Sequence, residues 1–480
     1  MSTRFSRRHF LSAIALLAGS GAAGAALSAC GATPAPAATQ APAAATQAPA
    51  AATEAPTAAQ ATEATAAPAA AGGGAVTIRW LDWSDQDDII NAAIAKLKEK
   101  HPNVTVNFEP IGDQWGDKQL TQMVSGNAPD LLTGNDQTSY IWAEKNQLLD
   151  LNPLVDRDLT SDQIADFFEY QWNGLLYPGN KQRMGLPYYT WIYQYYINLD
   201  AFAEAGLTPP KAGWKLDDYD LDLTKLTKKD DSGKVTRWGG MDNSYDPFRF
   251  EMWLRIFGGN MVDPNDWTKC VLNTKEAKDA FEWHRVRLFE KNTLIQQTQV
   301  GQLTNMDPIA TEKVAIMGEG NGNEGLMLDN PPKFKWGCVA PPIGPTGKAQ
   351  GIGTIDNWGI WKGTKAPDVV WDLLKIVAIQ DDFQLAFAAK WVATPNRKSL
   401  LPKFAAAVKA KYKDATDDQI QPQLDLLTSG AVQIGTQFKK HKASLEIINP
   451  AMEQILRTGT AKPDILDSVA DQVTKLNQEA

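Results

Sequence analysis

The stretch VTIRWLDWSDQDDIINAAIAKLKEKHPNVTVNF, residues 76–108, decides the fold class. Val76–Trp80 alternates apolar and polar residues, as a half-buried strand does. Apolar residues then recur at the spacing of one helix face, at Ile89, Ile90, Ala93, Ile94 and Leu97. His101-Pro102 ends this helix, because proline disfavours the helical conformation of the residue before it, and Val104–Phe108 predicts a second strand. A strand–helix–strand unit is typical of a parallel sheet, so the sequence predicts an α/β fold.

The rest of the chain continues the alternation of strands and helices. Ser125–Leu132 predicts a helix end, a turn and a strand, and helical patterns return near 276–290 and 367–390. In the first of these two helices His284 shares a face with apolar residues, so we interpret it as a core residue rather than a metal ligand. No internal repeat is evident, and no apolar run of membrane-spanning length follows residue 30.

Composition argues against several classes of function. The 480 residues include 47 Lys and Arg against 56 Asp and Glu, a formal net charge of −9. An acidic chain is a poor partner for nucleic acid, whose affinity depends on contacts between basic residues and phosphates. Only four histidines are present, which argues against a zinc hydrolase or a Ser-His-Asp enzyme. Sixteen tryptophans indicate instead a protein that packs aromatic rings against the flat apolar faces of a binding partner.

The first thirty residues predict an exported lipoprotein. Ser6–Leu11 resembles a twin-arginine export signal, and Leu27-Ser28-Ala29-Cys30 resembles a lipobox, in which Cys30 would be lipidated. Residues 31–74 are nearly all Ala, Pro, Thr, Gln and Gly, and this composition predicts a disordered tether. Because twin-arginine substrates leave a reducing compartment already folded, we favour buried free thiols over a disulfide for Cys270 and Cys338.

Two local motifs resemble known sites but lack features that those sites need. Gly320–Gly325 matches G-x-G-x-x-G, but only Leu326–Asn330 separate it from Pro331-Pro332, so we expect no helix and no nucleotide site there. The oxygen donors Asp242, Asn243, Ser244 and Asp246 fail the spacing of a calcium loop. We therefore expect no metal and no cofactor.

Aromatic residues are densest in Tyr188–Tyr196, YYTWIYQYY. On a strand, Trp191, Tyr193 and Tyr195 would point to one side and their even-numbered neighbours to the other. Most aromatics in a strand belong to the core or the sheet surface. Tyr188 and Tyr189 are the exception, because they directly follow Gly185-Leu186-Pro187, where a chain crossing could lie.

The order of motifs resembles the extracellular solute-binding proteins of bacterial ABC importers, in the carbohydrate-binding family that includes maltose-binding protein. The resemblance covers about 76–400, and its most specific part is Gly185–Tyr188 with Tyr195–Pro210. Further matches are Val76–Trp83, Lys100–Val106, Ser125–Leu132, Asn146–Leu151, Lys313–Met317 and Pro395–Ser399. The chain departs from the family where Ile309 and Glu312 replace the usual Phe and Gly, and where the loop 320–325 replaces a common Trp.

This resemblance implies a two-lobed periplasmic-binding-protein-like fold of type II, with a ligand cleft between the lobes. Lobe 1 would comprise 75–187 and 343–364, and lobe 2 would comprise 188–342 and 365–480. The implied protein is a monomeric, lipid-anchored receptor outside the cell membrane that passes a mono- or oligosaccharide to ABC permease subunits and has no catalytic residue. Alternatives are a binding protein for a polyol, peptide or polyamine, or an exported glycan-active enzyme.

The resemblance also places candidate ligand-binding residues at the mouth of the cleft. They are Trp83, Ser84, Asn135, Asp136, Tyr188, Tyr189, Tyr245, Trp253, Asn321, Asn323, Asn357 and Trp358. For a neutral sugar, we expect aromatic stacking rather than charge to supply most of the affinity.

Overall fold

The sheet is organised around one long strand, β4 (Leu186–Asn198). The computed structural model describes residues 75–83, 87–112, 115–242, 245–303 and 306–479. The other strands are β1 (Val76–Asp82), β2 (Val104–Pro110), β3 (Leu131–Asn135), β5 (Lys228–Lys229), β6 (Val235–Asp242), β7 (Val262–Asp263), β8 (Asp266–Cys270), β9 (Val314–Gly320), β10 (Trp336–Val339), β11 (Gly351–Ile360), β12 (Thr394–Pro395) and β13 (Val432–Gln433).

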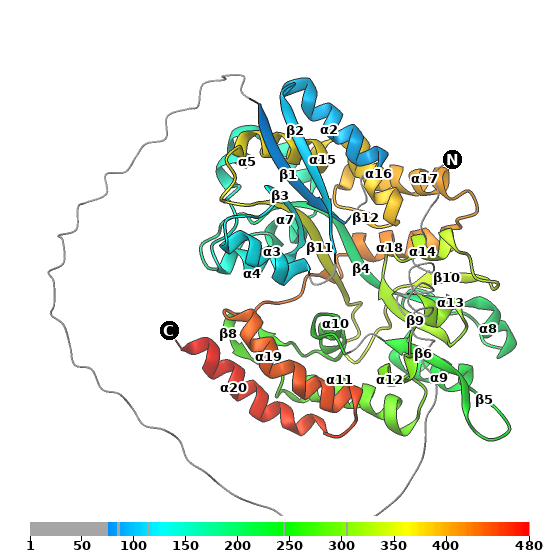
Figure 1. Ribbon diagram of the computed structural model, residues 1–480. Coiled ribbons are helices and arrows are strands. Elements are labelled where there is room, and N and C mark those ends of the chain that lie inside the picture. Colours follow the sequence, from blue (N-terminus) through cyan, green and yellow to red (C-terminus); the bar gives the residue numbers. More distant parts are fainter. Residues whose placement is uncertain (1–74, 84–86, 113–114, 243–244, 304–305, 480) are drawn as a thin grey trace, which may run out of the picture. The chain divides into compact units, whose positions relative to one another are not determined.

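Strand β4 belongs to both halves of the main sheet, whose order is β2-β1-β3-β11-β4-β9-β6-β5. Its first part, up to Ile192, pairs antiparallel with β11, and from Tyr193 onward it pairs antiparallel with β9. Strands β1, β2 and β3 are parallel to one another, and so are β6 and β9. Figure 1 shows β4 running from the side of β1–β3 to the side of β6 and β9.

Helices cover both halves of the sheet. They are α2 (Asp88–Lys100), α3 (Trp115–Val124), α4 (Asp136–Glu144), α5 (Asn152–Asp158), α6 (Ser161–Asp166), α7 (Glu169–Gly174), α8 (Leu199–Glu204), α9 (Leu216–Leu226), α10 (Pro247–Phe257), α11 (Lys275–Arg285), α12 (Gln297–Val300), α13 (Asp307–Ala310), α14 (Glu324–Asp329), α15 (Pro367–Ile379), α16 (Asp381–Trp391), α17 (Leu401–Lys411), α18 (Asp417–Thr428), α19 (His441–Met452) and α20 (Leu466–Gln478). None of the helices within the described ranges is both long enough and apolar enough to cross a bilayer.

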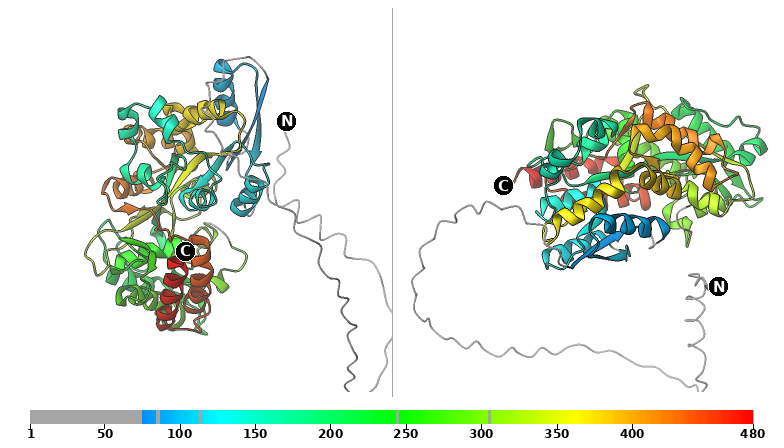
Figure 2. Two further views of the ribbon diagram at one scale, coloured as in Figure 1. Left: turned by 90° about the vertical axis from the view of Figure 1, so that its left-hand side faces the viewer. Right: turned by 90° about the horizontal axis from the view of Figure 1, so that it is seen from above.

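Two large hydrophobic cores lie on either side of the shared strand. One joins β1 and β11 to α2, α15 and α16, around Trp80, Trp358 and Trp371. The other joins β9 to α9, α10, α11, α19 and α20, around Phe250, Trp253 and Phe281. Figure 2 shows these two groups of helices from the side, with the strands passing between them. Helices α15 and α16 thus share the core of β1, whereas the sequence expectation grouped 365–480 with lobe 2.

Most of the predicted elements are confirmed. Strands β1, β2 and β3 and helix α2 occur where their patterns predicted them, and the helical pattern near 367–390 corresponds to two helices, α15 and α16. His284 is fully buried, and its Nδ1 lies 3.0 Å from the carbonyl oxygen of Ala280. Cys270 and Cys338 are free, buried and in different cores.

One local expectation was wrong. A short helix, α14, does begin at Glu324, although the spacing before Pro331-Pro332 suggested that no helix would fit. Six residues suffice for this helix because it ends at Asp329, before the proline pair.

Candidate ligand-binding site

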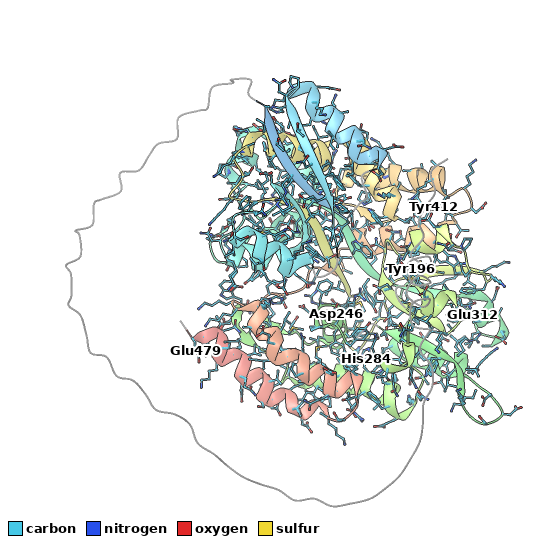
Figure 3. All side chains as sticks on the ribbon, in the orientation of Figure 1. Tyr196, Asp246, His284, Glu312, Tyr412 and Glu479 are labelled. Atoms are coloured by element: carbon cyan, nitrogen blue, oxygen red, sulfur yellow. The ribbon has the colours of Figure 1, made fainter. Side chains whose placement is uncertain are left out.

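A cavity of about 410 Å³ lies beside the middle of β4. It draws residues from both halves of the sheet, and Asp246 on its wall is labelled near the centre of Figure 3. The lining residues are Trp83, Asn135, Gln137, Tyr189, Trp191, Tyr193, Asp246, Phe248, Arg249, Glu319, Gly320, Ile352, Thr354, Asp356 and Trp391.

Sheet geometry brings the first group of these residues together. Trp83 directly follows β1 and Asn135 ends β3, and the carboxyl ends of parallel strands meet at one edge of a sheet. Strand β11 lies antiparallel beside β3 and contributes Ile352, Thr354 and Asp356. These three residues line the same wall because alternate side chains of a strand point to the same side.

Aromatic rings form a second wall on β4. Tyr189, Trp191 and Tyr193 alternate along the strand and therefore face the cavity together. The ring centroids of Tyr189 and Trp191 are 6.5 Å apart. Gly320 on the neighbouring strand leaves room for the indole, since a Cβ at that position would lie 2.7 Å from Cε3 of Trp191.

A third wall, at the start of α10, carries charge. Asp246 caps the helix by accepting a hydrogen bond from the Phe248 amide at 3.0 Å, and Pro247 follows at the first helical position. This start places Arg249 over the end of β9, where its Nη1 donates to Glu319 Oε2 at 2.9 Å. Arg249 Nε also lies 3.8 Å from the carboxylate of Asp246. Burial alone would lower the pKa of Arg249, but these two carboxylates raise it, so its charge is held by its neighbours.

Buried acids lie on the wall formed by β11 and α4. Asp356 is 5% exposed, and burial together with the carboxylates of Asp136 and Asp82 raises its pKa well above the usual range. Asp136 is also buried, and this burial raises its pKa to about 7 although its Oδ1 accepts a hydrogen bond from the Ile355 amide at 3.1 Å. The protonation of Asp356 and Asp136 should therefore change when a charged group or a hydrogen-bond donor enters the cavity.

Several polar groups of the wall have no hydrogen-bond partner among the described residues. Asn135 uses its side-chain oxygen to cap α4, at 2.9 Å from the Thr138 amide, which leaves its amide NH₂ group unpaired. The side chains of Gln137 and Thr354 likewise make no hydrogen bond to a described group. Such groups are available to bind the hydroxyls of a ligand.

Three of the twelve residues predicted from sequence line this cavity: Trp83, Asn135 and Tyr189. Asp136 lies behind the wall, next to Asp356. Ser84 lies outside the described residues. So do Asn243 and Ser244, two of the oxygen donors whose spacing fails that of a calcium loop. Tyr245 is 37% exposed and follows that gap, beside Asp246 but not on the cavity wall.

Three predicted aromatic contacts are core residues instead. Tyr188 and Trp358 are stacked on each other with ring centroids 3.8 Å apart, and each is at most 1% exposed. Trp358 also donates its Nε1–H to Asp82 at 2.7 Å. Trp253 is stacked against Trp283 in the other core. None of the three rings has a free face for a ligand.

The three predicted asparagines are buried and are engaged within the protein. Asn321 accepts from the Ile192 amide at 2.7 Å, and its amide donates to Thr394 and Gln423. It therefore fixes β4 at the point where its pairing partner changes. Asn323 donates to the Gly320 carbonyl, and Asn357 accepts from Ser139 at 3.0 Å.

The cavity also contains residues that the sequence analysis did not select. Trp191 and Tyr193 could have been found from the alternation along β4, since they share the face of Tyr189. Arg249 and Glu319 carry no local signal, because their pairing depends on how α10 packs beside β9. Trp391 carries no local signal either. It ends α16 and reaches the cavity from the core that α16 shares with β1.

Comparison with known proteins agrees with this architecture. Residues 82–395 match the family model described as bacterial extracellular solute-binding protein. The chain belongs to this family. A binding protein of Brucella abortus strain 2308 is 22% identical to this solute-binding protein over 294 residues, which is 61% of this chain and 68% of the relative.

Solved structures confirm the expected two-lobed α/β fold of this solute-binding protein. The Listeria monocytogenes ABC substrate-binding protein Lmo0181, in complex with cycloalternan, superposes with a TM-score of 0.72 at 18% identity, over 84% of this chain and 99% of that chain. Maltose-bound MalE3 of T. maritima superposes with a TM-score of 0.68 at 17% identity, again over 84% and 99%. A Thermotoga lettingae solute-binding protein bound with α-D-tagatose gives 0.68 at 19% identity over the same shares.

Proposed function

We propose that this chain is the substrate-binding receptor of an ABC importer and that it captures a mono- or oligosaccharide in the cavity beside β4. The observation that carries the proposal is the composition of the lining: Tyr189, Trp191 and Tyr193 present rings from one strand, beside polar groups that have no partner in the described protein. Family membership supports the receptor role. The sugars bound in the similar structures support the ligand class.

The chemistry of these walls suits a sugar. A pyranose ring presents C–H groups on its faces and hydroxyls around its edge. Aromatic rings remove the apolar faces from water, while the amides of Asn135 and Gln137 and the hydroxyl of Thr354 are placed to pair with hydroxyls. A volume of about 410 Å³ is within the usual range of small-molecule sites.

The lobes of the proposed receptor would follow the two cores. We assign β1–β3 and α15–α16 to lobe 1, because they share one core, and α9–α11 with α19 and α20 to lobe 2. In this division β4 crosses between lobes at Ile192 and Tyr193, where its partner changes from β11 to β9. Ligand binding would then close the lobes by a hinge motion about this crossing.

The proposal also includes how the receptor is held at the membrane. Cys30 would be lipidated after twin-arginine export, and residues 31–74 would tether the folded part outside the cell membrane. The receptor would act as a monomer, pass its ligand to the permease subunits and catalyse no reaction. The lipobox sequence and the family's extracellular description support this placement.

A ligand screen tests the proposal. Purified residues 31–480 are melted in the presence of mono- and oligosaccharides, polyols, polyamines and oligopeptides, and the variant Trp191→Ala is screened in parallel. A carbohydrate should raise the melting temperature of the wild type more than that of the variant. A rise with only polyols, polyamines or peptides contradicts the sugar assignment. Conversion of a glycan to products, measured by mass spectrometry, contradicts a role limited to binding.

A further inference from the structure

Asp356 is the most unusual group on the cavity wall. It lies on β11, paired in register with Asn135 on one side and Tyr189 on the other, and it is 5% exposed. No described residue donates a hydrogen bond to its carboxylate. A buried carboxylate without a donor or a cation is costly, so its partner is expected to come from outside the chain.

The carboxylates behind Asp356 increase this cost. Asp82 is fully buried and accepts hydrogen bonds from Thr133 and Trp358, both at 2.7 Å. Asp136 is held by the Ile355 amide through Oδ1, and its Oδ2 has no partner among the described groups. Three acids are thus gathered at one wall, and the like charges of Asp136 and Asp82 act on Asp356.

The wall formed by the start of α10 does not supply the missing positive charge. Arg249 is the single cationic residue among the described lining residues, and it already contacts Glu319 at 2.9 Å and Asp246 at 3.8 Å. With Asp356, the lining has three carboxylates against one guanidinium, a formal net charge of −2 when all are ionised. A cationic group entering the cavity would therefore be attracted by the whole wall as well as by Asp356.

We propose that the ligand is an amino sugar whose protonated amine pairs with Asp356. This inference rests on the proposed function, because it specifies which carbohydrates the same cavity favours. A hydroxyl of a neutral sugar can form a hydrogen bond with Asp356 in its protonated form, whereas an ammonium group stabilises the ionised carboxylate, which burial and the neighbouring acids otherwise disfavour. Tyr189 neighbours Asp356 in the sheet and Trp191 follows on the same face, so aromatic rings lie beside the site and favour a cation through their π faces.

Matched pairs of sugars test the proposal. Calorimetry compares glucosamine with glucose, galactosamine with galactose, mannosamine with mannose, and diglucosamine with cellobiose, at low salt and at about 0.5 M salt. Each monosaccharide pair differs in one amine, and the disaccharide pair differs in two. For the pairs that bind, the amine should increase affinity about tenfold to a hundredfold, and salt should weaken the amine member more than the neutral one.

Two variants locate the effect. Asp356→Asn keeps the size of the side chain and should abolish the preference for the amine, while the free variant should melt no lower than the wild type because like charges are removed. The control Asp414→Asn removes an exposed acid that does not line the cavity and should keep the preference. If Asp356→Asn fails to fold, the salt comparison on the wild type still decides the question.

The outcomes separate this inference from the function on which it rests. Neutral sugars that bind as well as their amines, or a preference that survives Asp356→Asn, overturn the amino-sugar inference and leave the carbohydrate receptor standing. Binding of neither class of sugar, with binding of peptides or polyols instead, overturns both.

Discussion

Gly320 lies directly against the indole of Trp191, so closely that a methyl group at position 320 would lie 2.7 Å from Cε3 of that ring. The absence of a side chain at position 320 of β9 is therefore what allows Trp191 on β4 to line the cavity.

Substitution of this glycine should damage binding through Trp191. We expect Gly320→Ala to displace the indole and to weaken ligand affinity about tenfold, with an overpacking cost of about 1–3 kcal/mol in stability. Gly337→Ala is the matched control, because its Cβ would lie 3.6 Å from Asp418 in ordinary contact. Calorimetry with the ligand found by screening measures both variants. Equal affinity in the two would contradict the role given to Gly320.

Cavity and core aromatics should respond differently to truncation. Trp191→Ala should weaken binding about tenfold or more, since a ring that loses roughly 60–80 Å² of exposed surface to a ligand contributes about 1.5–2 kcal/mol at 25 cal/mol per Å². Trp358→Ala should instead lower the free energy of unfolding by about 3–5 kcal/mol, because it empties a core position beside Tyr188. Urea unfolding and calorimetry on both variants separate the two effects. A stable Trp358→Ala protein that has lost only its ligand affinity would place that ring in the site after all.

These aromatics show what the sequence could and could not predict. The order of strands and helices follows from local periodicity, and so does the separation of Tyr188 from Tyr189 onto opposite faces of a strand. Which face borders the cavity depends on the packing of α16 and β11 against β4, which no local pattern encodes. For the same reason the sequence could not show that Asn321 and Asn357, both predicted to bind ligand, use their side-chain amides in hydrogen bonds within the protein.

Asp136 should make stability depend on pH. Its pKa is about 7 in the folded protein against an ordinary value of 3.8, so between these values the folded state keeps a proton that the unfolded chain has released. The stability contributed by this group is therefore present at low pH and falls as pH rises from about 4 to about 7.

The variant Asp136→Asn lacks this dependence. The free energy of unfolding of the variant minus that of the wild type should increase between about pH 4.5 and about pH 7.5 in urea titrations. His441, whose pKa is lowered to about 4 by burial, changes stability in the opposite direction but does so in both proteins. A difference that stays constant with pH would show that Asp136 is ionised throughout.

Lipidation should depend on Cys30. Cells grown with a radioactive fatty acid should label the wild-type protein, and Cys30→Ala should abolish the label and yield either a soluble folded protein outside the membrane or an unprocessed precursor. Cys270→Ala is the control, since that thiol is buried and should not affect labelling. A label retained in Cys30→Ala would remove the lipobox assignment.

Ligand should change the distance between the lobes. Small-angle scattering is expected to give a smaller radius of gyration at saturating ligand, because the two cores are joined by few strands. Trp191→Ala serves as the control, because its weaker binding should shift the contraction to ligand concentrations about tenfold higher or more. An unchanged radius for the wild type, with binding proven by calorimetry, would speak against hinge closure.

The shared strand has a further consequence, for the way the protein unfolds. Leu186 and Tyr188 of β4 belong to one core, and Tyr195 and Ile197 of the same strand belong to the other. Neither half can lose its structure without exposing a strand on which the other half depends. The two lobes should therefore melt together in one cooperative transition, rather than as two domains joined by a linker.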